Sequence, residues 1–385
     1  MTPFTFNTSA SIQFGAGALE KLGALTHARI GESVFLVTDP GMIATGIVAR
    51  ALASLEAAGV AAVVFSDVQA DPPAEMILKA VEAASAAKVD GVIGLGGGSS
   101  LDTAKLVALL APGHEKLSDV FGVGNAKGPR LPLILAPTTA GTGSEVTPIS
   151  IVTTGENEKM GVVSPIILPD VALLDPELTL GLPAPVTAAT GIDAMVHAIE
   201  AYASTNVNNN PLSRSLACQA LTLLGGAIET AVHRGADIEA RSAMLLGSLL
   251  AGQAFANSPV AAVHALAYPL GGHFHIPHGL SNALVLAHVL RFNCKSAPGP
   301  YVEIAPFAFP NLAALEGQAR AEAFCDALQD LSLKCGLPQR LRDLNVPESV
   351  LPTLARDAMN QKRLLVNNPR EITEADALEI YRRAW

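Results

Sequence analysis

The first half of the chain alternates short β-branched runs with alanine-rich stretches of helical character. Strand-like runs at 33–39, 61–67, 91–95 and 131–137 are separated by helix-like segments such as 74–88. Strands joined in this way pair in parallel, because each helical crossover brings the chain back to the same edge of the sheet. A parallel sheet is covered on both faces and binds ligands beyond the carboxyl ends of its strands. We therefore predict an α/β domain with a parallel sheet.

The second half has a different pattern. From about Thr187 the strand signals fade and apolar residues recur at helical spacing. A chain of 385 residues, half of them apolar, exceeds what one compact core usually holds. We predict an α/β domain over residues 1–184 and an all-helical domain over residues 185–385, with the boundary near 181–187.

Charge and cysteine usage exclude several classes of partner. The net charge of −10 and the pI of about 5.4 repel a phosphate backbone, so we expect no nucleic-acid partner. The four cysteines form no C-x-x-C pair, which fits a reducing compartment. The N-terminus lacks the basic end and apolar stretch of a signal peptide. We expect a cytoplasmic protein.

Residues 242–290 contain no Asp, Glu, Lys or Arg, yet they carry five of the nine histidines. The segment is long enough to cross a bilayer, but prolines, the Gly271-Gly272 pair, amide side chains and the histidines interrupt every window of about 20 residues. We therefore expect protein interior, no membrane partner, and a role for the histidines there.

The stretch "VIGLGGGSSLDTAK" (92–105) places a glycine-rich turn between a strand and a helix. Ser99 and Asp102 have the spacing of a capping box. Glycines let the backbone approach a ligand closely, and a helix N-terminus offers free N–H groups, so the turn suits a pyrophosphate. The spacing matches neither G-x-G-x-x-G nor a Walker loop, and a tight turn without a ligand stays open as an alternative.

Two further features follow predicted strands. Asp39 closes the run 33–39, where an acid either binds the ribose hydroxyls of an adenine nucleotide or caps the next helix. The loop "PTTAGTGSEVT" (137–147) offers hydroxyls that suit phosphate or nicotinamide, although it also fits an ordinary polar loop.

The histidines suggest a metal site. Asp193 and His197 lie four residues apart on a predicted helix over 189–203 and so share one face. His264 and His278 would be about 21 Å apart in one unbroken helix, but Pro269, Gly271-Gly272 and Pro277 argue for two helices with a turn, the second beginning near Gly279. The four residues would then surround Fe(II) or Zn(II).

Four other polar residues near the expected ligands in sequence are not expected to bind the metal themselves. His273, His275 and His288 are interpreted as packing residues, residues that support a ligand from behind, or pocket residues, rather than as ligands. Glu200 either supports a ligand from behind or is a solvated helix residue.

Taken together, these motifs resemble those of the iron-containing (group III) alcohol dehydrogenase family. The motifs "GGGSSLDTAK", "PTTAGTGSEVT", "ATGIDAMVHAIEAY" and "HALAYPLGGHFHIPHGLSNA" match in that order, and the resemblance covers nearly the whole chain. It implies a Rossmann-like NAD-binding domain, an all-α metal-binding domain of the dehydroquinate synthase-like type, and an active site in the cleft between them.

The resemblance also implies roles for individual residues. The metal ligands would be Asp193, His197, His264 and His278. The cofactor contacts would be Asp39, Gly97, Gly98, Ser99, Thr138, Thr139, Thr142, Thr147, Lys159 and Leu178. Two positions depart from the family pattern: Tyr268 stands where many members carry a His thought to assist proton movement, and Asp71, a tentative cofactor contact, stands where Asn is common.

We therefore expect an NAD-dependent alcohol dehydrogenase that uses Fe(2+), or alternatively Zn(2+), on a small alcohol, diol or aldehyde. A Zn-dependent polyol dehydrogenase resembling glycerol dehydrogenase is the nearer rival, but it typically uses one Asp and two His. A dehydroquinate synthase-like lyase would need Lys and Arg around a phosphorylated acid, which the charge-free segment lacks. The family often forms dimers through N-terminal strands, so we expect a homodimer or larger homo-oligomer.

Overall fold

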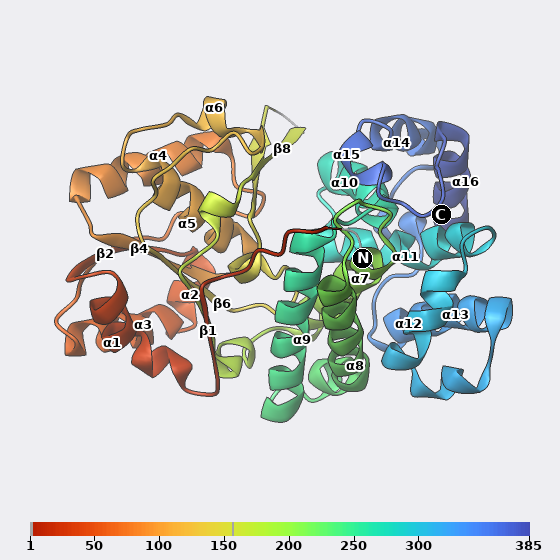
Figure 1. The fold of residues 1–385 in the computed structure, drawn as a ribbon, viewed down its shortest axis with the longest axis horizontal. Coiled ribbons are helices and arrows are strands. Elements are labelled where there is room, and N and C mark those ends of the chain that lie inside the picture. Colours follow the sequence, from red (N-terminus) through yellow and green to blue (C-terminus); the bar gives the residue numbers. More distant parts are fainter. Residues whose placement is uncertain (1–2, 156–157) are drawn as a thin grey trace. The chain divides into compact units, whose positions relative to one another are not determined.

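The computed structural model describes residues 3–155 and 158–385, and its chain folds as two units. One unit is Asn7–Gly181, and the other is Leu182–Trp385 together with the N-terminal segment that ends at Phe6. Figure 1 shows strands and helices in the first unit and helices in the second.

The first unit is built on a parallel six-stranded sheet. Its strands, in spatial order, are β1 (Ser11–Phe14), β9 (Val171–Leu174), β6 (Leu133–Pro137), β4 (Gly91–Gly96), β2 (Ser33–Val37) and β3 (Ala61–Phe65). A second sheet of three strands consists of β5 (Gly122–Val123), β8 (Glu158–Val163) and β7 (Ile149–Thr154). The prediction of a parallel α/β sheet is confirmed.

Helices cover both faces of the large sheet (Figure 1). They are α1 (Leu22–Arg29), α2 (Pro40–Ala44), α3 (Ile47–Ala57), α4 (Ala74–Ala87), α5 (Gly98–Leu110) and α6 (Leu117–Val120), with short 3-10 turns η1 (Ala18–Lys21), η2 (Ser144–Val146), η3 (Pro165–Ile167) and η4 (Pro176–Thr179). Because side chains alternate along a strand, Val34 and Leu36 of β2 pack toward α1 and α3, whereas Phe35 and Val37 pack toward α4 and α5.

The strand order reverses between β2 and β4, and open α/β sheets form a ligand-binding crevice at the carboxyl ends of such strands. The chain leaves β2 for β3 on one side and returns to β4 on the other side. Neighbouring strands whose connections run in opposite directions form the position where open α/β sheets bind ligands. Asp39 and the glycine turn directly follow these two strands.

The described part of the second unit contains helices and no strand. The helices are α7 (Ala184–Ala203), α8 (Pro211–His233), α9 (Ile238–Asn257), α10 (Ala262–Phe274), α11 (His278–Cys294), α12 (Gly299–Ala308), α13 (Gly317–Lys334), α14 (Leu351–Ala358), α15 (Lys362–Leu365) and α16 (Glu374–Ala384), with 3-10 turns η5 (Pro310–Ala314), η6 (Leu341–Leu344) and η7 (Glu348–Val350). Helix α7 is buried along most of its length and packs against α8, α9 and α11.

The uncharged segment 242–290 forms most of α9, α10 and α11, and most of its side chains are buried. As expected, His264 and His278 lie on different helices. The break is narrower than predicted, because α10 continues through Pro269 and Gly271-Gly272 to Phe274 and is followed by the C-cap residue His275, whose φ is 55°. Among the described residues, α8 alone has the length and apolar composition that could span a membrane, with 44% of the apolar window buried.

Candidate metal centre and nucleotide site

Helix α7 supplies two of the four expected metal ligands. Asp193 and His197 are one turn apart on it, and both are buried. The ring of His197 stacks on Phe255 of α9 with centroids 4.2 Å apart, which fixes the orientation of the imidazole.

The other two ligands come from the beginnings of α10 and α11. His264 is the third residue of α10 and His278 is the first residue of α11. Close packing brings α11 against α7: a Cβ on Gly279 would lie 2.5 Å from the carbonyl oxygen of Ala189, so only glycine allows this approach. The glycine thereby places His278 beside Asp193.

The four side chains converge. One ligand-type atom from each of Asp193, His197, His264 and His278 lies within 4.8 Å of the others. The Oδ1 atom of Asp193 is 3.9 Å from His264 Nε2 and 3.8 Å from His278 Nε2. These separations are too long for hydrogen bonds. They suit ligands that share one ion at bond lengths of about 2.0–2.2 Å.

An unpaired buried atom shows that the cluster fits a cation. Among the described residues, His264 Nε2 has no hydrogen-bond partner although it is buried. The other ring nitrogen, Nδ1, lies 2.7 Å from the carboxylate of Glu200. An imidazole held by a carboxylate on one nitrogen and free on the other is the usual arrangement of a metal-binding histidine.

The charges of the cluster favour a cation as well. Burial alone would raise the pKa of Asp193, but the three neighbouring imidazoles and a hydrogen bond from Asn282 outweigh burial and lower that pKa below its ordinary value. The amide of Asn282 donates to Asp193 Oδ1 at 2.6 Å. The side chain of His278 is 37% exposed whereas that of Asp193 is 3% exposed, so the cluster is open on the side of His278.

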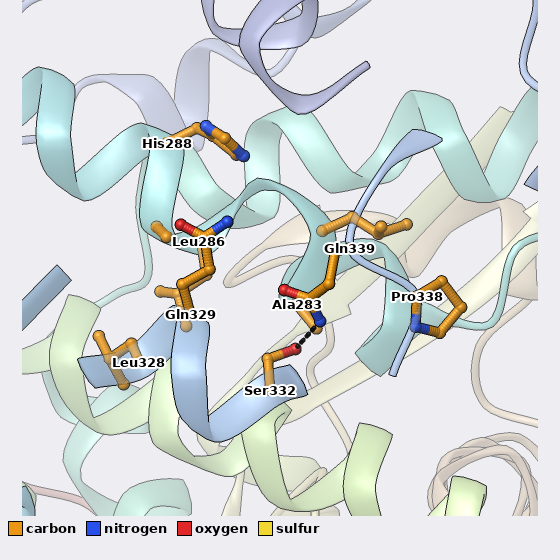
Figure 2. Close-up of a pocket in the computed structure, with 10 residues that line it drawn as sticks. Ala283, Leu286, His288, Leu328, Gln329, Ser332, Pro338 and Gln339 are labelled. Carbon is orange, nitrogen blue, oxygen red and sulfur yellow. Dashed lines mark hydrogen bonds between the residues drawn. The ribbon is translucent and has the colours of Figure 1, made fainter. Parts of the chain in front are cut away.

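The three other histidines of the segment lie outside this cluster. His273 Nε2 is 2.7 Å from the Asp357 carboxylate, and His275 is exposed at the end of α10. His288 lines a pocket between α11 and α13 with Gln329 and Ser332 (Figure 2). Burial first, and then nearby arginines, lower the pKa of His288 to about 4. His288 therefore lines a pocket as interpreted, whereas His273 and His275 are exposed and are not packing residues of the core.

Tyr268 lies one turn beyond His264 on α10. The centre of its half-buried ring is 5.9 Å from that of His278. The phenol therefore stands next to the more exposed ligand of the cluster.

Asn282 is a neighbour of the cluster that sequence reasoning missed, and the role of Glu200 stayed open. Both could have been found from spacing, because Glu200 lies seven residues after Asp193 and Asn282 lies four residues after His278. Each therefore shares a helix face with a ligand.

In the first unit, the glycine turn lies against the threonine-rich loop. A Cβ on Gly98 would be 2.8 Å from Thr142 Cγ2, and one on Gly97 would be 3.6 Å from Thr139 Cγ2. The backbone N–H of Thr138 donates to the Gly96 carbonyl at 2.9 Å. The two loops thus form one cradle at the carboxyl ends of β4 and β6.

Asp39 lies beside the same cradle. It caps α2 by accepting from the N–H of Met42 at 3.2 Å, and its second oxygen accepts from Ser100 Oγ at 3.2 Å. The two expectations for this residue are therefore compatible, because a helix cap with one edge on the crevice can also meet ribose hydroxyls.

The capping-box prediction for Ser99 and Asp102 is wrong. Helix α5 begins after Gly97 without any side-chain cap. Asp102 instead accepts from Ser144 Oγ at 2.6 Å and from Ile151 N–H at 2.9 Å, so it holds the far end of the threonine loop. These long-range partners compete successfully with the local cap.

Lys105 supports the same loop from within the core. Its ammonium group is fully buried and donates to the Ile149 carbonyl at 2.6 Å and to Thr147 Oγ1 at 3.3 Å. Burial lowers the pKa of Lys105, and the Asp102 carboxylate at 3.4 Å opposes that change. Thr147 is thus enclosed rather than presented to solvent.

Three further expected cofactor contacts lie in different surroundings. Lys159 Nζ pairs with Asp71 Oδ1 at 2.5 Å, on the second sheet and its neighbouring loop. Leu178 is buried in the apolar core on the α1 and α3 side of the large sheet. Ser99 is the second residue of α5 and is half-buried.

Family models match nearly the whole chain. Residues 9–176 match the profile described as iron-containing alcohol dehydrogenase, and residues 187–385 match the Fe-containing alcohol dehydrogenase family, C-terminal. The chain belongs to the iron-containing alcohol dehydrogenase family. A member of that family, long-chain-alcohol dehydrogenase 1 of Geobacillus thermodenitrificans, is 42% identical to this chain over 96% of this chain and 94% of its own length.

Solved structures of the iron-containing alcohol dehydrogenases share the whole fold. A 1,3-propanediol oxidoreductase superposes with a TM-score of 0.95 at 35% identity, covering 100% of both chains. Sulfoacetaldehyde reductase of Bifidobacterium kashiwanohense, solved with NAD⁺, has a TM-score of 0.89 at 30% identity over 100% of this chain and 99% of its own. The expected family, fold and enzyme class are confirmed, the expected pair of iron and NAD agrees with these findings, and neither rival activity is favoured.

Proposed function

We propose that this protein is an NAD-dependent alcohol dehydrogenase and aldehyde reductase that acts on a small alcohol, diol or aldehyde with a divalent ion, Fe(2+) or alternatively Zn(2+). The observation that carries the proposal is the convergence of one carboxylate and three imidazoles within 4.8 Å. The unpaired Nε2 of His264 supports it from an independent direction.

Asp193, His197, His264 and His278 would hold the ion. When bound, the ion would supply Lewis acidity that favours ionisation of an alcohol hydroxyl near neutral pH. The segment 242–290, which supplies His264 and His278, has no charged side chain of its own that could compete with the ligands. The partly exposed His278 marks the side from which a substrate oxygen would approach.

The cradle of the first unit would bind NAD. Gly97, Gly98 and Ser99 would receive the pyrophosphate at the uncapped N-terminus of α5, where free N–H groups and the helix dipole favour anions. Asp39 would accept from the ribose hydroxyls and repel the extra phosphate of NADP. The remaining proposed contacts are Asp71, Thr138, Thr139, Thr142, Thr147, Lys159 and Leu178.

The supporting contacts suggest different roles within that set. The side chains of Thr139 and Thr142 lie against the glycine turn and would meet the cofactor directly. Thr147 is held by Lys105, so it would act by shaping the loop. Asp71 would position Lys159, because the two side chains already form an ion pair.

Oxidation of the alcohol releases a hydride to the nicotinamide and a proton to the protein or solvent. Tyr268 is our proposed proton-transfer residue, since its ring lies 5.9 Å from that of His278 and it stands at the family's relay position. In the reverse direction, the same residue would return a proton to the product oxygen.

We further propose that the protein is a cytoplasmic homodimer. The strand β1 is an edge of the large sheet, so one side of its backbone has no strand partner among residues 3–155 and 158–385. Its outer side chains Ile12 and Phe14 are 38% and 41% exposed. An edge with apolar side chains is a natural surface for pairing with a second copy. Light scattering of the purified protein would give twice the chain mass if this is correct.

The proposed activity is tested by purifying the protein anaerobically with added Fe(II) and following NADH oxidation at 340 nm with short aldehydes, lactaldehyde and hydroxy-acid precursors. We expect turnover with at least one short aldehyde and a clear preference for NADH over NADPH. No turnover with any aldehyde in a metal-loaded sample would contradict the proposal, and a strong NADPH preference would contradict the role of Asp39.

A further inference from the structure

We propose that Glu200 is a positioning residue that fixes His264 in the tautomer able to bind a metal ion, and that it thereby sets the metal affinity of the centre. This inference rests on the proposed function, because it concerns the same ion. The inference assigns Glu200 an effect on metal binding that is transmitted through the ligand His264.

Three donors converge on the buried Glu200 carboxylate. Its Oε2 atom is 2.9 Å from the N–H of Ala261 and 2.7 Å from His264 Nδ1, and its Oε1 atom is 2.6 Å from the N–H of Val263. Two of these donors are backbone groups, which can only donate. The carboxylate is therefore used on both oxygens.

These contacts assign the ring proton of His264 to Nδ1. Both oxygens of the Glu200 carboxylate already accept from backbone N–H groups, so this carboxylate serves as the acceptor for the ring N–H as well. The proton therefore stays on Nδ1, which donates to Glu200, and Nε2 keeps its lone pair. That lone pair belongs to the buried atom that has no partner among the described residues and that faces the Asp193 carboxylate at 3.9 Å.

The same carboxylate also ties two helices together. Asp193, His197 and Glu200 lie on one face of α7 at spacings of four and three residues. The N–H groups that Glu200 accepts belong to the start of α10, whose N-cap residue Ala261 provides no side-chain cap. One side chain thus caps α10 and holds its histidine at a fixed distance from the ligands of α7.

The test is the Glu200→Gln variant, which keeps the size of the side chain. In either orientation, the Gln amide places its N–H₂ group against a backbone N–H group. The substitution also removes the negative charge that Glu200 places beside His264. Titration of the metal-free proteins with Co(II), followed by its visible absorption, should show affinity about 10–100-fold weaker in the variant than in the parent.

The matched control is Asp357→Asn. Asp357 accepts from His273 at 2.7 Å, which is the same type of carboxylate–imidazole pair outside the ligand cluster. The metal affinity of the Asp357→Asn variant should equal that of the parent. Equal affinity in Glu200→Gln and the parent would overturn the inference, whereas a parent that binds no metal would overturn the proposed function itself.

A second measurement does not depend on the variant folding. Long-range ¹H–¹⁵N spectra of the metal-free parent with ¹⁵N-labelled histidine, at pH 8, report which ring nitrogen of His264 is protonated. We expect the Nδ1–H form, and in folded Glu200→Gln a smaller share of it. A parent in which His264 carries its proton on Nε2 would overturn the inference.

Discussion

The strongest prediction for the first unit concerns Asp102, which joins α5 to the threonine loop. Its carboxylate accepts from Ser144 Oγ and from the N–H of Ile151, and it lies 3.4 Å from the buried ammonium of Lys105. The Asp102→Asn variant offers one acceptor oxygen in place of two and turns an N–H₂ group toward a donor. It also removes the negative charge of the carboxylate that lies 3.4 Å from the ammonium.

The cost can be worked out from these contacts. Loss of one hydrogen bond to a charged group costs about 1.5–3 kcal/mol, and breaking a buried ion pair from one side costs about 3–5 kcal/mol. Because Asp102 is 16% exposed and the ion pair is long at 3.4 Å, we take the low end of the ion-pair range as the total cost. The loop should lose about 3 kcal/mol of local stability, which is about a hundredfold in an equilibrium constant.

Hydrogen exchange followed by mass spectrometry measures this change directly. Peptides spanning 138–151 should exchange about a hundredfold faster in Asp102→Asn than in the parent. The double variant with Lys105→Met should recover part of the loss, since it removes the stranded charge. Asp119→Asn, which changes an exposed acid hydrogen-bonded to the adjacent Ser118, is the control and should not alter exchange. A change below about threefold in Asp102→Asn would refute the reasoning.

Three further predictions follow from single contacts. The pKa of His288 is lowered from 6.5 to about 4, so on acidification the unfolded chain binds a proton at this residue before the folded chain does. The free energy of unfolding should therefore fall by up to about 3 kcal/mol as the pH drops through this range. In urea unfolding between pH 7 and 5, a His288→Asn variant should show a smaller fall, and an identical fall would contradict the assignment. Gly98→Ala places a Cβ 2.8 Å from Thr142 Cγ2, so KM for NADH should rise about tenfold or more with little change in melting temperature, and an unchanged KM would remove Gly98 from the cofactor site. Tyr268→Phe should lower kcat about a hundredfold and change its pH profile if the phenol transfers a proton, whereas an unchanged profile would assign that step to water.

Periodic features of the chain could be predicted from the sequence. Short β-branched runs and helical spacing depend on local burial, so the strands β2, β3, β4 and β6 and the helix around Asp193 were predicted close to their observed positions. The grouping of the metal-type ligands was also predictable, because Asp193 and His197 are one helical turn apart and because His264 and His278 lie in a segment with no charged side chain to pair with them.

Features decided by long-range contacts could not be predicted. Asp102 has the spacing of a cap, but Ser144 and Ile151, more than 40 residues away in sequence, determine what it binds. Pro269 normally ends a helix, yet α10 continues through it within the packed interior. Lys159 was assigned to the cofactor from motif position alone, and its pairing with Asp71 depends on a loop brought next to the second sheet.

The most direct test of the whole account is metal analysis of the anaerobically purified parent beside His278→Ala. His278 is the most exposed of the four ligands, so its loss disturbs the core least while removing one donor from the cluster. We expect about one Fe(II) or Zn(II) per chain in the parent, together with NADH-dependent reduction of aldehydes. The variant should lose most of its bound metal and most of its turnover. Equal metal content and equal turnover in the two proteins would contradict the account.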